Sequence, residues 1–183
     1  MLFAPIANAV GPLLPANRLD DINTLRQAVN TAFQSNLGLL NVQTTSTGTG
    51  ADTTEDTLAT FSLPAATLSS YGDTLRIRAY GTCAANANNK TMKLYFGSEV
   101  ITTPTAATNA KNWSLELVVT NSGSNTQVVI GNGLVDTTAV TPYFATGAEN
   151  VNTATVTIKC TGTNGTSSAG DVTLKGFIVE IIS

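Results

Sequence analysis

The chain has 183 residues, of which 11% are charged and none is histidine, and its formal net charge is −3. This length suits one well-buried domain with an appendage. Because Lys and Arg are few, there is no electrostatic footprint for a nucleic acid, and we expect no direct nucleic-acid partner. The lack of histidine excludes a Ser-His-Asp or Cys-His catalytic group and a histidine-ligated zinc site.

The first segment, residues 1–17, is predicted to be an extended arm. It contains Pro5, Pro12 and Pro15 and carries no charge before Arg18, so it is neither a membrane-spanning helix nor a typical secretory signal. An apolar run of this kind packs on its own domain or on another protein chain, and we favour the second. The residues expected to bind that partner are Leu2, Phe3, Ile6, Leu13 and Leu14.

Residues 18–38 are predicted to form an α-helix. Asn17 and Asp20 resemble a capping box at its start, and Gly38 suits its end. One apolar stripe runs along the predicted helix. The stripe packs against the sheet of the domain or forms a seam between subunits around a symmetry axis, and the seam favours a homotrimer. It consists of Ile22, Leu25, Val29, Ala32 and Phe33.

Residues 39–56 are predicted to be a polar linker, because the stretch TTSTGTGADTTED has no apolar residue larger than alanine. Within it, Asp52, Glu55 and Asp56 form an acidic cluster. The cluster lacks the ligand order and the bend glycine of a calcium loop. We therefore expect a solvated loop and no structural metal.

From residue 57 to residue 183 the pattern is wholly β, with alternating apolar and polar residues between clusters of Gly, Asn, Ser, Thr and Pro. Eight antiparallel strands in a segment of this length fit a two-sheet jelly roll best, and an immunoglobulin-like sandwich is the competitor. The strands are expected near 57–63, 73–84, 90–97, 113–121, 126–131, 140–145, 153–161 and 171–182.

The alternation also predicts which side chains face the core. The last strand runs apolar along its length, so it should be paired on both sides or covered. Cys83 and Cys160 are too few for a four-cysteine zinc site; we expect two buried apolar residues, with a disulfide as the alternative. The predicted core comprises Leu75, Ile77, Leu94, Phe96, Trp113, Leu115, Leu117, Val119, Val156, Ile158 and Cys160.

Three phrases within residues 57–182 carry a resemblance: SLPAATLSSYGDTLRI, AANANNKTMKLYFG and VTLKGFIVEI. They resemble segments of tailed-bacteriophage virion proteins with a β-sandwich or jelly-roll domain. The general character of the sequence is similar to that of capsid cement, or decoration, proteins. The resemblance implies a structural protein on the outer surface of the capsid, with the major capsid protein and further copies of itself as partners. It transfers no functional residue, since such proteins act through surfaces.

Three functions follow as hypotheses. The predicted one is a cement protein that binds and stabilises the phage head through its arm and its subunit contacts. The alternative is a tail-fibre or receptor-binding module for a host-surface glycan, although only 6% of residues are aromatic. A carbohydrate-active enzyme would need a carboxylate pair, and we expect no enzyme activity, no cofactor and no membrane partner. The carboxylates considered for such a pair are Asp136, Glu149, Asp171 and Glu180.

Overall fold

The computed structural model divides the chain into two compact units, Met1–Leu37 and Gly38–Ser183. In the first unit the described positions are helical. The predicted arm and the bounds of the predicted helix lie outside the described residues. Those are residues 22, 24, 25, 38–107 and 109–182.

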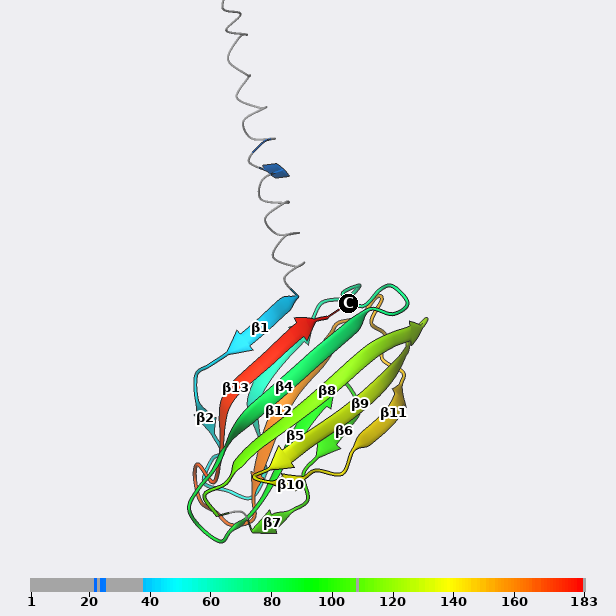
Figure 1. Ribbon diagram of the computed structural model, residues 1–183. Helices are drawn as coiled ribbons and strands as arrows, with labels where there is room; N and C mark the ends of the chain where they lie inside the picture. Colours follow the sequence, from blue (N-terminus) through cyan, green and yellow to red (C-terminus); the bar gives the residue numbers. More distant parts are fainter. Residues whose placement is uncertain (1–21, 23, 26–37, 108, 183) are drawn as a thin grey trace, which may run out of the picture. The chain divides into compact units, whose positions relative to one another are not determined.

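The second unit is mainly β and consists of two antiparallel sheets in a sandwich-like arrangement (Figure 1). The larger one, sheet A, contains β1 (Leu39–Gln43), β2 (Thr47–Gly48), β4 (Thr74–Cys83), β8 (Asn112–Gly123), β9 (Thr126–Val135), β10 (Thr138–Ala139), β11 (Tyr143–Gly147) and β13 (Val172–Ile181). The smaller one, sheet B, contains β3 (Glu55–Leu63), β5 (Asn89–Phe96), β6 (Glu99–Thr102), β7 (Ala106–Ala107) and β12 (Val156–Asn164).

The strand order brings distant parts of the chain together. Sheet A runs β1-β13-β4-β8-β9-β10, with β11 paired to β9 and β2 paired to β13. Sheet B runs β3-β12-β5-β6, with β7 paired to β5. Because β13 lies between β1 and β4, the prediction that the last strand is paired on both sides is confirmed. The loop AANANNK joins β4 of one sheet to β5 of the other, so it is a crossover between sheets and not a hairpin turn.

Each of the eight predicted strand segments overlaps an observed strand, but the prediction of eight strands in all was too low. The strands that were not predicted are β1, β2, β6, β7 and β10. Of these, β6 has four residues and β2, β7 and β10 have two each, too few to show a period of two. Strands β1 and β2 fall within the segment 39–56 that was expected to be a linker. In β1 an irregularity between Leu39 and Asn41 interrupts the alternation that would have indicated a strand.

One apolar core lies between the two sheets. All of the predicted core residues are buried, which confirms that part of the prediction. Ile77 and Leu117 of sheet A and Leu94 and Ile158 of sheet B have no exposed surface. Burial of each such side chain stabilises the fold by roughly 1.5–3 kcal/mol. The sheets are therefore held face to face by the inward positions of their strands.

Both cysteines lie in this core as thiols, Cys83 on β4 and Cys160 on β12, and the disulfide alternative is not realised. Burial raises the pKa of the Cys160 thiol to about 12. A thiol with so high a pKa carries almost no thiolate at neutral pH, so Cys160 has the character of a small apolar core residue.

Candidate binding surface

Sheet A exposes large apolar side chains on the side that faces away from the core. Among residues 38–182, every exposed large apolar side chain except Tyr71 belongs to this outer side. Phe144 is 73% exposed, and none of the described segments covers these strands (Figure 1). We call this set the apolar face. It comprises Leu39, Val42, Tyr80, Ile130, Leu134, Phe144 and Ile182.

The pairing of strands gathers the apolar face into two flanks. On one flank Ile130 of β9 lies directly opposite Phe144 of β11, and Val118 of β8 lies on its other side. On the other flank Val42 of β1 lies opposite Ile178 of β13. Cross-strand neighbours on one face are close enough for their side chains to touch. Each flank is therefore a continuous apolar patch.

A charged strip separates the two flanks. Arg76 Nη1 lies 3.3 Å from Glu180 Oε1, and its Nε lies 4.0 Å from Glu116 Oε2. Arg78 Nη2 lies 3.7 Å from the same Glu180 oxygen. These pairs are partly exposed to solvent, and such pairs contribute only about 0–1 kcal/mol each to stability. The strip carries two positive and two negative side chains, so it adds no net charge to the face.

A depression of about 330 Å³ lies at the strip and is lined in part by Arg78, Tyr80 and Ser114. Tyr80 leans from β4 over Gly176 of β13, its cross-strand partner. A β carbon at Gly176 would come within 2.3 Å of the tyrosine ring, so the glycine is needed for the ring to lie flat. The apolar face therefore has a defined relief, formed by the depression and by the Tyr80 ring over Gly176.

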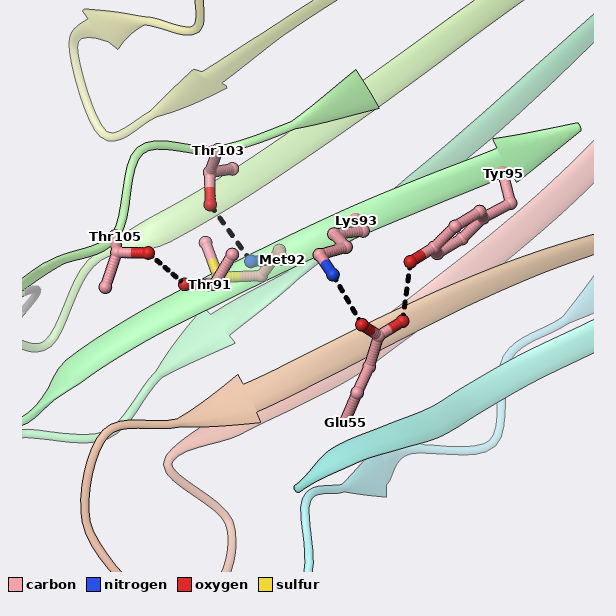
Figure 2. A network of polar contacts seen from close by, with 7 residues as sticks. All are labelled: Glu55, Thr91, Met92, Lys93, Tyr95, Thr103 and Thr105. Carbon is pink, nitrogen blue, oxygen red and sulfur yellow. Dashed lines mark hydrogen bonds and ion pairs between the residues drawn. The ribbon is translucent and has the colours of Figure 1, made fainter. Parts of the chain in front are cut away.

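Sheet B has an outer side of the opposite character. Figure 2 shows its most connected group, in which Glu55 accepts hydrogen bonds from Lys93 Nζ and from Tyr95 Oη, the latter at 2.7 Å. Partial burial alone would raise the pKa of Glu55, but these hydrogen bonds lower it to about 2. The Lys159 ammonium lies 4.5 Å from the centroid of the Tyr95 ring. Most of the remaining outward positions carry hydroxyl groups, among them Thr57, Thr60, Ser62, Thr91, Thr102, Thr157 and Thr163.

At one end of the sandwich a buried polar cluster closes the crossover between β4 and β5. Lys90, only 1% exposed, donates from Nζ to Asn86 Oδ1 at 2.7 Å and to Asn88 O at 2.9 Å. The Asp171 carboxylate accepts from Asn86 Nδ2 at 2.6 Å and from Asn88 Nδ2 at 2.8 Å. Burial by itself raises the pKa of Asp171, but these amide hydrogen bonds leave it below its ordinary value. The cluster fixes the loop.

The acidic cluster of the sequence is divided among separate partners. Asp52 accepts hydrogen bonds from the backbone and hydroxyl groups of Thr54, and Asp56 accepts one from the backbone of Gly50. Glu55 belongs to the network on sheet B. In the described part of the chain, no group of three or more His, Cys, Asp or Glu side chains could hold a metal ion.

The four carboxylates considered for an enzyme also have separate partners. Asp136 lies 3.5 Å from Lys111 Nζ, and Glu149 accepts from the backbone and hydroxyl groups of Ser98. Asp171 belongs to the cluster around Lys90, and Glu180 to the charged strip. The structure brings no two of these four carboxylates to a common partner among the described residues.

The predicted partner-binding residues fall mostly outside the described part of the chain, namely all five residues of the arm and three of the helix stripe: Leu2, Phe3, Ile6, Leu13, Leu14, Val29, Ala32 and Phe33. The other two stripe residues are helical and exposed, Ile22 by 48% and Leu25 by 65%. The apolar face itself was missed. Its signal was present in QVVIGNGLV, where both phases of the alternation carry apolar residues.

Comparisons of the chain with protein families, with curated proteins and with solved structures found no match. In the portion of the chain that was searched, no helix has the length and apolar character needed to cross a membrane. The function has to be inferred from the surface of the β unit.

Proposed function

We propose that the protein is a structural virion protein, a capsid cement or decoration protein that binds and stabilises the head of a tailed bacteriophage. The observation that carries the proposal is the apolar face, which concentrates the exposed apolar side chains of the β unit on one sheet. Monomeric soluble proteins rarely expose contiguous apolar patches, and such patches mark sites of protein interaction. In this proposal the protein acts through burial of surface between subunits.

The proposed partners are the major capsid protein and further copies of this chain, on the outer surface of the capsid. Apolar area contributes about 25 cal/mol per Å² when it leaves water, so an interface of several hundred Å² offsets a large part of the association cost. The apolar arm anchors the protein on the shell, and the helix stripe forms a trimer seam. The low fraction of charged residues, 11%, supports a role in which surface is buried against partners, because burial of neutral surface avoids the desolvation of ions.

For the fold, we propose a jelly roll enlarged by an insertion. Without β9, β10 and β11, the strand orders β1-β13-β4-β8 and β3-β12-β5-β6 describe two four-stranded sheets. Most strands that follow one another in the chain lie in different sheets, as in an eight-stranded jelly roll. Strands β9, β10 and β11 then form an insertion that widens sheet A. This insertion carries Ile130, Leu134 and Phe144, so one flank of the apolar face is an addition to the eight-stranded framework.

The alternative function, a tail-fibre module for a host-surface glycan, has less support. Sugars bind on open aromatic rings, and on sheet B the ammonium of Lys159 already occupies one face of the Tyr95 ring. Among the exposed aromatic residues of the β unit, Tyr71 lies outside the apolar face and Tyr80 lies on it. Phe144, the most exposed residue of that face, lies opposite the aliphatic side chain of Ile130. That setting favours a protein partner over a sugar.

The proposal is tested by adding the purified chain back to heads stripped of it. Phe3→Ala combined with Leu13→Ala should weaken binding on the order of a hundredfold or more, because each buried side chain contributes roughly 1.5–3 kcal/mol. Tyr71→Ala is the matched control, since Tyr71 is 84% exposed and lies outside the apolar face. If the wild-type chain does not bind heads, the cement function is wrong; if the double variant binds as well as wild type, the arm is not the anchor.

A further inference from the structure

We infer that the apolar face of sheet A is the contact surface for a second copy of this chain, related by a two-fold axis. The proposed function includes contacts between copies of this chain, and the inference says which surface makes one of them. It rests on that part of the proposed function and does not require a capsid. It uses residues of β strands, whereas the proposed trimer seam uses residues of the helix. The two contacts can therefore be separated by mutation.

The size of the face fits an interface between two copies. Six strands, from β1 to β11, spaced by about 4.8 Å give a width of about 24 Å. The 10 residues of β4 at about 3.3 Å each give a length of about 33 Å. Because β1 and β11 are shorter, the area is on the order of 700 Å². Stable protein interfaces bury about 800 Å² on each partner, so this face is large enough.

The charges of the strip make the face complementary to itself. Arg76 and Glu180 are cross-strand partners on neighbouring strands, and so are Arg78 and Glu116. A two-fold axis in the plane of the interface, parallel to the strands and between β4 and β8, lies in the middle of the six strands and places Arg78 of each copy over Glu116 of the other. In a two-fold contact the same patch is used by both copies, so each such contact occurs twice.

The apolar flanks and the neutral strip together favour a second copy over a partner of different charge. A strongly acidic or basic partner would be attracted by a face of one sign, whereas the strip in the middle of this face carries both signs in equal number. Each arginine keeps a glutamate of its own chain close by, which offsets the cost of removing the strip from water. The flanks supply the apolar area that drives association.

The test measures the molar mass of the full chain by light scattering after size-exclusion chromatography over a range of concentrations. Ile130→Lys combined with Phe144→Lys should halve the mass found for wild type, because the contact would have to remove four ammonium groups from water. Tyr71→Lys is the matched control and should leave the mass unchanged. Both positions of the double variant are exposed, by 48% and 73%, so the fold should be retained, which the thermal transition checks.

A second readout assigns the contact to one sheet. Ser114→Cys introduces a thiol within the depression on sheet A, and Ser62→Cys introduces one on the outer side of sheet B. As concentration rises, labelling of the Ser114→Cys thiol should slow several-fold, whereas labelling of the Ser62→Cys thiol should not change. Equal labelling at all concentrations, or a double variant with the mass of wild type, would overturn the inference.

The same variants separate this inference from the cement function. A double variant of half the mass that still binds heads supports the two-fold contact and leaves the cement function intact. A double variant of unchanged mass that no longer binds heads means that the capsid protein covers the apolar face, which overturns the second copy as its occupant.

Discussion

The outer sides of sheets A and B are built on the same core and yet differ in chemistry. Sheet A turns Ile130, Leu134 and Phe144 toward solvent, whereas sheet B has no exposed large apolar side chain among its described residues. A strand needs apolar residues only on its inward side to hold a sandwich together. Sheet B shows what the fold requires, and the apolar residues of sheet A exceed that requirement. The difference between the two sides is the reason to place the proposed binding surface on sheet A.

The largest effect should come from the core, which both sheets share. Phe177→Ala should destabilise the protein by about 3–5 kcal/mol, because it removes a fully buried aromatic ring and leaves a cavity. Its neighbour Ile178 faces outward on the same strand and is only half-buried, so Ile178→Ala should cost much less. Urea denaturation measures both. Equal losses would mean that the outer side of sheet A carries as much of the fold as the core does.

The crossover that joins the two sheets should be next in sensitivity. Lys90→Met should destabilise the protein by about 2 kcal/mol, because the carbonyl groups of Asn86 and Asn88 lose a buried charged donor. Lys159→Met is the control on sheet B, where the ammonium lies over the Tyr95 ring at the surface. We expect it to cost about 0.5–1 kcal/mol in the same denaturation experiment. A Lys90→Met protein as stable as wild type would contradict this role for the cluster.

The network on sheet B should give a moderate, pH-dependent effect. Glu55→Gln should cost about 1 kcal/mol at neutral pH, because partly exposed ion pairs are weakened by solvent. The folded-state pKa of Glu55 is about 2, below its ordinary 4.5, so its contribution is fully present above pH 4.5 and is lost as the pH falls through about 2. Unfolding curves of both proteins between neutral pH and pH 2 should converge in that window.

A double-mutant cycle with Lys93→Met isolates the Glu55–Lys93 term. The coupling free energy between the two side chains should decrease over the same pH window. A coupling that is constant with pH would mean that the carboxylate charge of Glu55 is not what stabilises the network.

The smallest change in stability should come from the apolar face. Ile130→Thr should alter the free energy of unfolding of the dissociated chain by less than about 0.5 kcal/mol, because the side chain is already exposed to water. Val129→Thr, one residue earlier and fully buried, should cost roughly 1–3 kcal/mol because it places a hydroxyl in the core. Denaturation at low protein concentration measures both. A large loss from Ile130→Thr would mean that the face serves the fold and not binding.

The regular strands and the core could be predicted from sequence because their period is local. Leu75 and Ile77 alternate with Arg76 and Arg78, and the structure places the first pair inside and the second outside. Strand β1 could not be predicted, since an irregularity between Leu39 and Asn41 interrupts the alternation that would have indicated it. Lys90 was also beyond reach, because a lysine at the start of a strand is usually solvated. Its burial depends on loop residues that accept its hydrogen bonds.

The apolar face could be predicted only in part. Apolar residues in both phases of QVVIGNGLV were visible, but a strand buried on both sides gives the same pattern. Only the pairing of β9 with β8 and β11 shows that Ile130 faces away from the core. The function expected from the sequence rested on composition and on the resemblance to virion proteins, and neither can place a surface on one sheet.

The central place of β13 in sheet A also sets the order in which the protein can fold. Leu39 and Leu75 belong to strands that become neighbours of β13 only after the chain has been synthesised through Ile181. Until then the facing edges of β1 and β4 have no partner between them. Such non-local pairings form in milliseconds to seconds, because the entropy of closing a long loop is lost before the contacts between the strands stabilise the pair. During that interval each new chain exposes two strand edges whose backbone N–H and C=O groups are unpaired, and such edges can pair with those of other chains. The yield of folded protein should therefore depend on how quickly β13 takes its place.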